Sequence, residues 1–427
     1  MTRRTLLASG LAAPALAGAA PDPLDGLLGG DGDPDYALPA WAGVGRGPRG
    51  RRMLARAEGL ADVAARRPMT TDSPARIASV SKLAATLGFM TLVEAGRVSL
   101  DDDVSDILGW TLRHPRFPNE RITPRRLLSH TSGLRDGSGY PVAFGFRLSD
   151  ALTPTGPFWK DDGFGPDSEP PGHWFAYCNT GFAVIGQLVE RIAGEAFGPF
   201  MTATVFRPLG LDCGYNWSGV SEAARGRAAV LYRKAASDEG PYDPAGPWIA
   251  QLDGALPARI AAEAVSRPWL QNRLIDDYAP GTNGFVFSPQ GGLRASVRDL
   301  DRLARLIAGG GAPLLKPETL RLMIEPAWRL DARRPNGDAY GGAIRAYGLG
   351  CQTLTGVAGD DLFDGCEGWI GHAGDAYGLT SGLWVEPGTG RSMTYVLTGE
   401  ARSLKANRGR SNFTRQEEAI AGALSRV

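Results

Sequence analysis

The chain has 427 residues, which is long enough for a large hydrophobic core and about two or three structural units. Its 46 Lys and Arg balance 46 Asp and Glu, and this neutral total argues against a nucleic-acid-binding protein, which usually carries a basic excess. The four Cys are too few for a disulfide-stapled scaffold. Only five of the cations are Lys, so a Lys in an unusual position is informative here.

Residues 1–20 have the layout of an export signal. Arg3 and Arg4 precede an uncharged stretch that ends in small residues compatible with a cleavage site. The Thr-Arg-Arg-x-Leu-Leu pattern resembles a bacterial twin-arginine signal, which predicts a periplasmic or secreted protein. The alternative is a membrane anchor, but the apolar stretch is shorter than the roughly 20 residues of a spanning helix. We therefore expect cleavage, and no stable membrane span after it.

The first elements are predicted from local patterns. Residues 21–38 are rich in Gly, Pro and Asp and are expected to form a flexible linker. Two short strands are expected at 41–44 and 53–60. Apolar residues at helical spacing then predict a long helix over Ser81–Glu94, which Gly96 would end.

The predicted secondary structure of the rest of the chain differs between a long irregular region and a more regular C-terminal part. Residues from about 115 to 275 are irregular, apart from an expected helix at 181–192. An amphipathic helix is expected at 299–308, a β-hairpin over 380–398 and a closing helix at 416–425. Strands at both ends of the chain predict one sheet assembled from the two termini, with a mainly helical lobe inserted between them.

The run Ser79-Val80-Ser81-Lys82 is the only S-x-x-K in the chain. Lys82 follows Ser79 by one helical turn, so both side chains point the same way. A Ser hydroxyl becomes a nucleophile when a base takes its proton, and a Lys with a depressed pKa can be that base. A free backbone N–H at the helix start could also stabilise an oxyanion. The alternative is a helix cap followed by a solvated Lys.

The run Tyr177-Cys178-Asn179 is the only Y-x-N among the eleven Tyr. A Tyr beside a Lys can relay protons, and an Asn amide can orient both a Lys and a substrate carbonyl. On its own, this run would more simply be a buried Tyr and a helix cap.

The run Gly371-His372-Ala373-Gly374 holds the only H-x-G among the four His. Small residues such as Gly374 would let a substrate lie close to a strand edge, and His372 would supply a polar or cationic group. The alternative is a tight turn with a surface His.

The three motifs each occur once, in the order S-x-x-K, Y-x-N, H-x-G. In this order the sequence resembles the serine β-lactamase and penicillin-recognising hydrolase superfamily, and within it the branch of class C β-lactamases, D-alanyl-D-alanine carboxypeptidases and family VIII esterases. The resemblance runs from about Trp41 to the C-terminus. It includes the segments 76–82, 127–134, 171–182, 208–211 and 291–293.

The resemblance implies an α+β fold. An antiparallel sheet flanked by helices, built from both chain ends, would form a sheet lobe at about 39–114 and 286–427. A mainly helical domain would be inserted at about 115–285. The cleft between the two lobes would be the ligand site. His130 invites a catalytic-triad interpretation, but its segment is structural in the resembling family and the chain has no G-x-S-x-G elbow.

The resemblance also implies roles. Ser79 would be the acylated nucleophile and Lys82 its general base, helped by Tyr177. Asn179 would bind substrate and hold Lys82. The oxyanion hole would be the backbone N–H groups of Ser79 and Asp375.

Three positions depart from the lactamase pattern. His372 and Gly374 would bind substrate, but His372 stands where lactamases carry a Lys. Because His is mostly neutral at pH 7, this weakens the case for an efficient lactamase. Asp375 places a carboxylate beside the oxyanion hole, which should disfavour an anionic substrate. Cys178 stands where Ser is common, and we expect it to pack rather than react.

These roles predict an exported serine hydrolase that transfers an acyl group from an ester, or from a D-amino-acid amide or peptide, to Ser79 and then to water. The alternatives are a β-lactamase and a non-catalytic penicillin-binding-like sensor or scaffold. The partner would be a small-molecule ester, peptide or β-lactam, with no cofactor, metal or nucleic acid. The natural substrate, the deacylation base, the oligomeric state and a Cys351–Cys366 disulfide stay open.

Overall fold

The structure is a computed structural model that describes residues 24–28, 37–166, 168–238, 240–254, 278–403, 405–406 and 408–427. The expected export signal at 1–20 lies outside these ranges. None of the helices in the described ranges combines the length and apolar composition needed to cross a bilayer.

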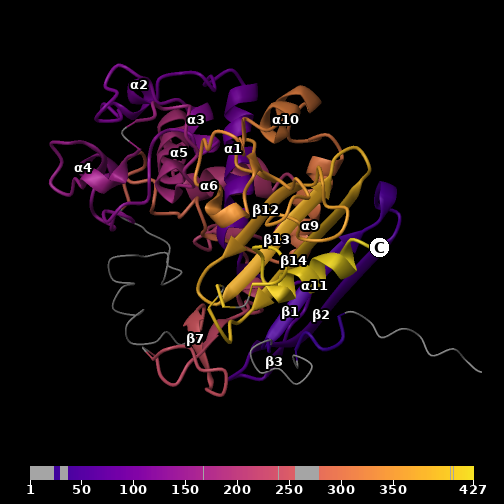
Figure 1. The fold of residues 1–427 in the computed structure, drawn as a ribbon. Coiled ribbons are helices and arrows are strands. Elements are labelled where there is room, and N and C mark those ends of the chain that lie inside the picture. Colours follow the sequence, from indigo (N-terminus) through magenta and orange to yellow (C-terminus); the bar gives the residue numbers. More distant parts are fainter. Residues whose placement is uncertain are drawn as a thin grey trace, which may run out of the picture.

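Nine strands of the described chain form one antiparallel sheet, in the order β3-β2-β1-β14-β13-β12-β11-β10-β9 (Figure 1). The first and last strands are neighbours, since β1 pairs with β14 from Ala40↔Thr398 to Arg46↔Ser392. This confirms an antiparallel sheet assembled from both chain ends. The strands are β1 Ala40–Arg46, β2 Met53–Asp62, β3 Arg67–Pro68, β9 Trp328–Arg329, β10 Ala346–Tyr347, β11 Gln352–Thr353, β12 Ile370–Asp375, β13 Leu379–Glu386 and β14 Arg391–Thr398.

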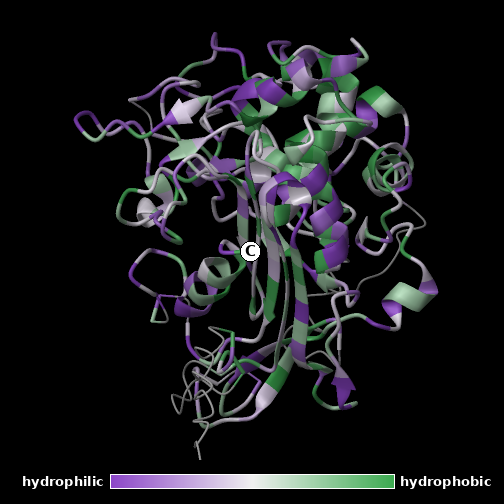
Figure 2. Ribbon diagram, turned by 90° about the vertical axis from the view of Figure 1, so that its right-hand side faces the viewer, coloured by the Kyte–Doolittle hydropathy of each residue, from purple (hydrophilic) through white to green (hydrophobic). Residues whose placement is uncertain are grey.

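Helices cover both faces of the sheet (Figure 2). Because side chains alternate along a strand, the two faces bury different residues. Trp41 and Tyr395 belong to the core cluster that includes residues of α11, whereas Val44 and Val396 belong to the larger cluster that includes residues of α9. The sheet is therefore a central layer with an apolar core on each of its two faces.

Most other helices gather at one end of the sheet, as Figure 1 shows for α1 to α6. The helices are α1 Ser81–Glu94, α2 Val104–Leu108, α3 Pro124–Leu128, α4 Leu148–Leu152, α5 Asn179–Ala193, α6 Phe197–Met201, α7 Glu222–Arg225, α9 Val297–Ala308, α10 Pro317–Ile324 and α11 Arg415–Leu424. Five further strands make two small sheets, in which β8 pairs with β4 and β5, and β6 with β7. Their bounds are β4 Ala75–Arg76, β5 Gly214–Tyr215, β6 Leu231–Lys234, β7 Trp248–Leu252 and β8 Leu293–Ala295.

The long sequence-predicted elements are present with small shifts at their ends. Helix α1 covers the predicted residues, and α9 begins at Val297 because Ser296 and Asp299 form a capping box there. Within the range expected to be a linker, Leu24 and Leu27 are buried in the cluster with Trp41, so this short turn packs on the sheet. All four Cys are buried free thiols, which includes the pair for which a disulfide stayed open.

Candidate active site

Ser79 lies in a tight 3₁₀ turn, Ala78–Val80, that runs directly into α1. Ala78 adopts a φ of 46°, a left-handed conformation that is uncommon for residues other than Gly. The first residue of α1 anchors this turn, because the Ser81 hydroxyl accepts a hydrogen bond of 3.1 Å from the backbone N–H of Leu293. Ser79 is half-buried between two buried neighbours, so the turn presents its hydroxyl to the pocket.

The Lys82 ammonium group is fully buried and donates to three oxygens. They are the Ser79 hydroxyl at 3.1 Å, the Asn179 side-chain carbonyl at 2.7 Å and the backbone carbonyl of Gln290 at 2.7 Å. Burial lowers the pKa of Lys82 to about 7, and the negative charge of Asp136 opposes this effect. A substantial neutral fraction therefore exists near pH 7, and it lies within reach of the Ser79 proton.

The Tyr177 ring covers the Lys82 ammonium, with the nitrogen 4.8 Å from the ring centroid. The Tyr177 side chain also makes a hydrogen bond with Ser79, which lowers its pKa, but the stronger effect of burial raises the pKa of Tyr177 well above its usual value. Tyr177 therefore keeps its proton near neutral pH. Of the two groups, Lys82 is the one with an unprotonated fraction near neutral pH.

Asp136 holds Asn179 at the start of α5. Its carboxylate accepts from the Asn179 side-chain amide at 2.8 Å and from the backbone N–H groups of Asn179 and Thr180 at 2.9 and 2.8 Å. Because the amide nitrogen faces Asp136, the amide oxygen must face Lys82. The sequence prediction did not include Asp136, although an acidic residue two positions after the 127–134 segment was the available signal.

Strand β12 lies unusually close to the turn that carries Ser79. A Cβ atom on Gly374 would be 2.6 Å from the Ile77 carbonyl oxygen and 3.0 Å from the Ser79 nitrogen. Only a glycine permits this approach without displacement. It brings the backbone of Gly374 and Asp375 beside that of Ser79, which is where the resemblance puts the oxyanion hole.

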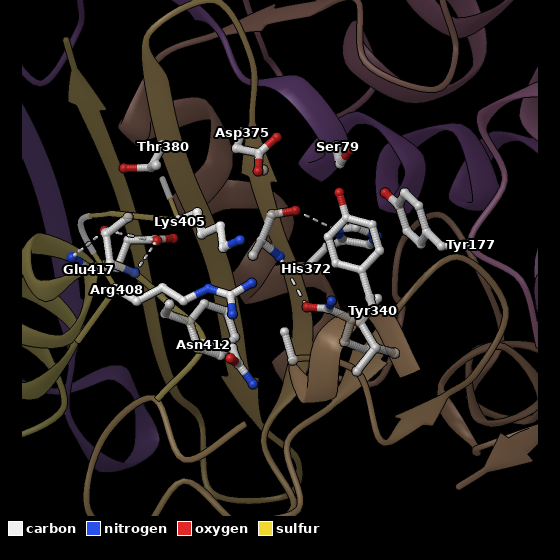
Figure 3. A pocket seen from close by; sticks show the side chains of 17 residues that line it. Ser79, Tyr177, Tyr340, His372, Asp375, Thr380, Lys405, Arg408, Asn412 and Glu417 are labelled. Carbon is white, nitrogen blue, oxygen red and sulfur yellow. Dashed lines mark hydrogen bonds between the residues drawn. The ribbon is translucent and has the colours of Figure 1, made fainter. Parts of the chain in front are cut away.

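Asp375 adds a negative charge to this part of the pocket. Its side chain lies beside Ser79, between Ser79 and Thr380 (Figure 3). Loss of solvent raises the pKa of Asp375, and the charge of Lys82 acts in the opposite direction. An anionic group on a substrate would meet this carboxylate close to the nucleophile.

His372 is buried in the floor of the pocket. Its Nε2 atom is 2.9 Å from the Tyr347 hydroxyl, and its Nδ1 atom is 2.5 Å from the Ala373 carbonyl oxygen. Burial, and then the charge of Lys82, lower the pKa of His372 to about 3. The imidazole is therefore neutral at working pH.

The structure brings all the sequence-predicted site residues together in one site. They come from the turn before α1, from α1 itself, from the residues at and just before the start of α5, and from β12. The same pocket is lined by residues that the sequence prediction did not include. Tyr340 faces His372 across it, while Lys405 and Arg408 lie on the side away from Ser79 (Figure 3). These three residues come from loops without a motif.

Comparisons with known proteins identify the family to which the chain is similar. The family profile described as Beta-lactamase matches residues 42–412. The chain is 30% identical over 162 residues to penicillin-binding protein 4* of Bacillus subtilis (strain 168), covering 36% of this chain and 33% of that protein. It is 29% identical over 324 residues to esterase EstB of Burkholderia gladioli, covering 73% of this chain and 74% of the esterase.

A solved structure of similar fold is the D-amino acid amidase of Ochrobactrum anthropi SV3 complexed with D-phenylalanine. It matches with a TM-score of 0.63 and 21% identity, over 94% of this chain and 97% of the amidase. In sequence, the matched region spans only about a third of penicillin-binding protein 4*. The profile match over most of the chain shows that the chain belongs to the beta-lactamase family.

Proposed function

We propose that this protein is a serine hydrolase that cleaves esters or D-amino-acid amides through an acyl-enzyme on Ser79. The observation that carries the proposal is the 3.1 Å contact between the Ser79 hydroxyl and Lys82, whose pKa is about 7. Neutral Lys82 takes the Ser79 proton as the hydroxyl attacks the carbonyl carbon. Tyr177, hydrogen-bonded to Ser79, donates its proton to the leaving group and takes the proton that Lys82 had accepted, so both groups return to their starting forms. Water then hydrolyses the acyl ester, and one of its protons restores the Ser79 hydroxyl.

The charges around Ser79 support an ester or amide without an anionic group near the scissile bond. His372 is neutral, and the Asp375 carboxylate lies beside the nucleophile, which Lys82 contacts from the other side as a partly protonated amine. The similarity to esterase EstB and the fold of the D-amino acid amidase support the same two classes of substrate. The similarity to penicillin-binding protein 4* keeps β-lactam acylation as the second candidate.

Labelling tests the nucleophile. A fluorescent fluorophosphonate should label the protein, and Ser79→Ala should abolish the label. The exposed Ser138→Ala serves as the control and should label like the natural protein. Labelling that persists in Ser79→Ala, or a natural protein that does not react, would contradict the proposal.

Turnover separates the substrate classes. Short p-nitrophenyl esters and D-phenylalanine amide should be hydrolysed with dependence on Ser79, and nitrocefin should be a poor substrate. Nitrocefin turnover comparable to that of the esters would instead identify a β-lactamase. A fluorescent penicillin that labels Ser79 without any turnover would favour the sensor or scaffold alternative.

We also propose that the protein is exported to the periplasm or beyond through the signal in residues 1–20. The support is the Arg3-Arg4 pair followed by an apolar stretch and small residues. In a bacterial host with a twin-arginine pathway, the natural chain should appear in the periplasmic fraction. Arg3→Lys combined with Arg4→Lys should keep it in the cytoplasm, and unchanged export of this variant would contradict the pathway.

A further inference from the structure

A buried chain of hydrogen bonds connects the residue before α5 to β12. The backbone N–H of Cys178 donates to Nδ1 of His130 at 3.1 Å. Nε2 of His130 is 3.2 Å from the Tyr347 hydroxyl, and that hydroxyl is 2.9 Å from Nε2 of His372. His130, Tyr347 and His372 are each at most 2% exposed, so water does not replace these contacts.

The protons along this chain have one consistent direction. A backbone N–H can only donate, so Nδ1 of His130 is an acceptor and neutral His130 carries its proton on Nε2. That proton points to the Tyr347 oxygen, and the Tyr347 hydroxyl in turn donates to Nε2 of His372. His372 is therefore protonated on Nδ1, and this N–H donates to the Ala373 carbonyl at 2.5 Å.

The start of the chain is rigidly held. His130 has a φ of 58°, and its backbone carbonyl accepts from the N–H of Ala176 at 2.9 Å. Its imidazole ring packs against Tyr177 at a centroid distance of 4.4 Å and against Phe182 at 5.4 Å. Such a conformation persists where the surrounding contacts over-determine it, so His130 cannot easily turn its ring to reverse the chain.

Reversal would also place two donors face to face. A proton on Nε2 of His372 would force the Tyr347 hydroxyl to turn toward His130. His130 would then need its proton on Nδ1, where the Cys178 N–H already points. The charged group facing His372 from α1 is Lys82, which also disfavours a second positive charge. Tyr177 and Tyr347 face it as neutral phenols, and Asp375 follows three residues later on β12.

We infer that His130 and Tyr347 are positioning residues that lock His372 in its neutral Nδ1–H form, so that His372 is an uncharged wall of the pocket and not an anchor for a substrate carboxylate. Both of its nitrogens are committed to the protein. The consequence for substrate class rests on the proposed function: the site takes acyl donors without an anionic group beside the scissile carbonyl, because the Asp375 carboxylate lies next to Ser79 and no charged His372 offsets it. The role of His130 thus extends beyond the structural one that the sequence predicted.

The tautomers can be observed directly, because the chain contains only four His. Protein labelled with ¹⁵N-histidine is studied by two-dimensional NMR from pH 5 to 9, with His372→Gln, His130→Gln and the exposed His173→Gln used to assign signals. We expect His372 to be neutral with its proton on Nδ1, and His130 neutral with its proton on Nε2, across this range. A His372 that titrates in this range, or that carries its proton on Nε2, overturns the inference.

Tyr347→Phe tests the consequence for catalysis. Removing the hydroxyl frees Nε2 of His372, so the neutral Nε2–H form becomes accessible and can donate to a substrate carboxylate. KM for a carboxylate-bearing ester should then fall several-fold relative to a matched neutral ester. Tyr278→Phe is the control, because it removes a partly buried hydroxyl that bonds Glu190 and Asn283 outside this pocket, and it should leave the ratio of KM values unchanged. An unchanged ratio in Tyr347→Phe overturns the substrate part. Because the NMR result does not depend on turnover, failure of the Ser79 labelling test remains distinguishable from failure of this inference.

Discussion

Asp136→Asn should move the acidic limb of the pH–rate profile to lower pH. Asp136 is the largest of the charges that raise the pKa of Lys82, and replacing it with Asn removes that charge while keeping the size of the side chain. With less opposing charge, burial lowers the pKa of Lys82 further. Since the neutral form of Lys82 is the base, activity should persist at lower pH than in the natural protein.

The size of the shift follows from the geometry. Two hydrogen bonds of 2.8 Å and 2.7 Å, in series through the Asn179 amide, place the Asp136 and Lys82 charges about 7 Å apart. At an effective dielectric constant of about 20, the interaction is about 2 kcal/mol. This corresponds to about one and a half pKa units. The midpoint should therefore fall from about 7 to about 5.5.

The assay is kcat/KM for a p-nitrophenyl ester as a function of pH, read at the isosbestic wavelength of p-nitrophenol, because this ratio reports ionisations of the free enzyme. The plateau should also drop, on the order of tenfold, because an Asn at this position cannot accept all the hydrogen bonds that now orient Asn179. Asp101→Asn, which removes an exposed carboxylate paired with Arg125, is the control and should leave the midpoint in place. A midpoint in Asp136→Asn that stays near 7, or rises, would refute the assignment of Lys82 as the base.

Three further predictions follow from other contacts. Gly374→Ala should lower kcat on the order of a hundredfold, because its Cβ would push β12 away from the Ser79 turn. Circular dichroism should show that this variant is folded. A kcat within twofold of that of the natural protein would contradict the close approach of β12 to Ser79. His372→Lys should lower KM for carboxylate-bearing esters, and an unchanged KM would contradict the reading of this position as an uncharged wall. Glu190 is buried and its pKa is raised from 4.5 to about 7, so its contribution to stability is lost as pH rises through this interval. Glu190→Gln should flatten the dependence of Tm on pH between those values, and a slope equal to that of the natural protein would refute this.

Local patterns predicted much of the fold. Helix α1 and the β13–β14 hairpin follow from periodicity and turn residues, which act over a few positions. One sheet assembled from both chain ends was expected from the strands at the two termini, and the pairing of β1 with β14 confirms it. The turn at Leu24–Leu27 shows the limit of composition, because two Leu side chains within a Gly- and Pro-rich stretch bury themselves on the sheet.

In the candidate site, too, some contacts could be predicted from local sequence patterns and others depend on the fold. Ser79 and Lys82 could be paired from sequence because one helical turn separates them. The Gln290 carbonyl that also holds Lys82 is 208 residues away and is a backbone group, so no side-chain motif could indicate it. Tyr347 and Asp136 act through other side chains, and their roles depend on which segments the fold brings into contact.

The neighbouring positions of β1 and β14 constrain how the protein is made. The Thr398 hydroxyl donates to the Ala40 carbonyl across 358 residues of sequence. Strand β14 lies within the sheet, between β1 and β13. The sheet can therefore close only after β14 has been synthesised and has left the ribosome. Contacts of such long sequence separation slow folding. A chain truncated before β14 would leave β1 and β13 with exposed hydrogen-bonding edges, which are templates for aggregation.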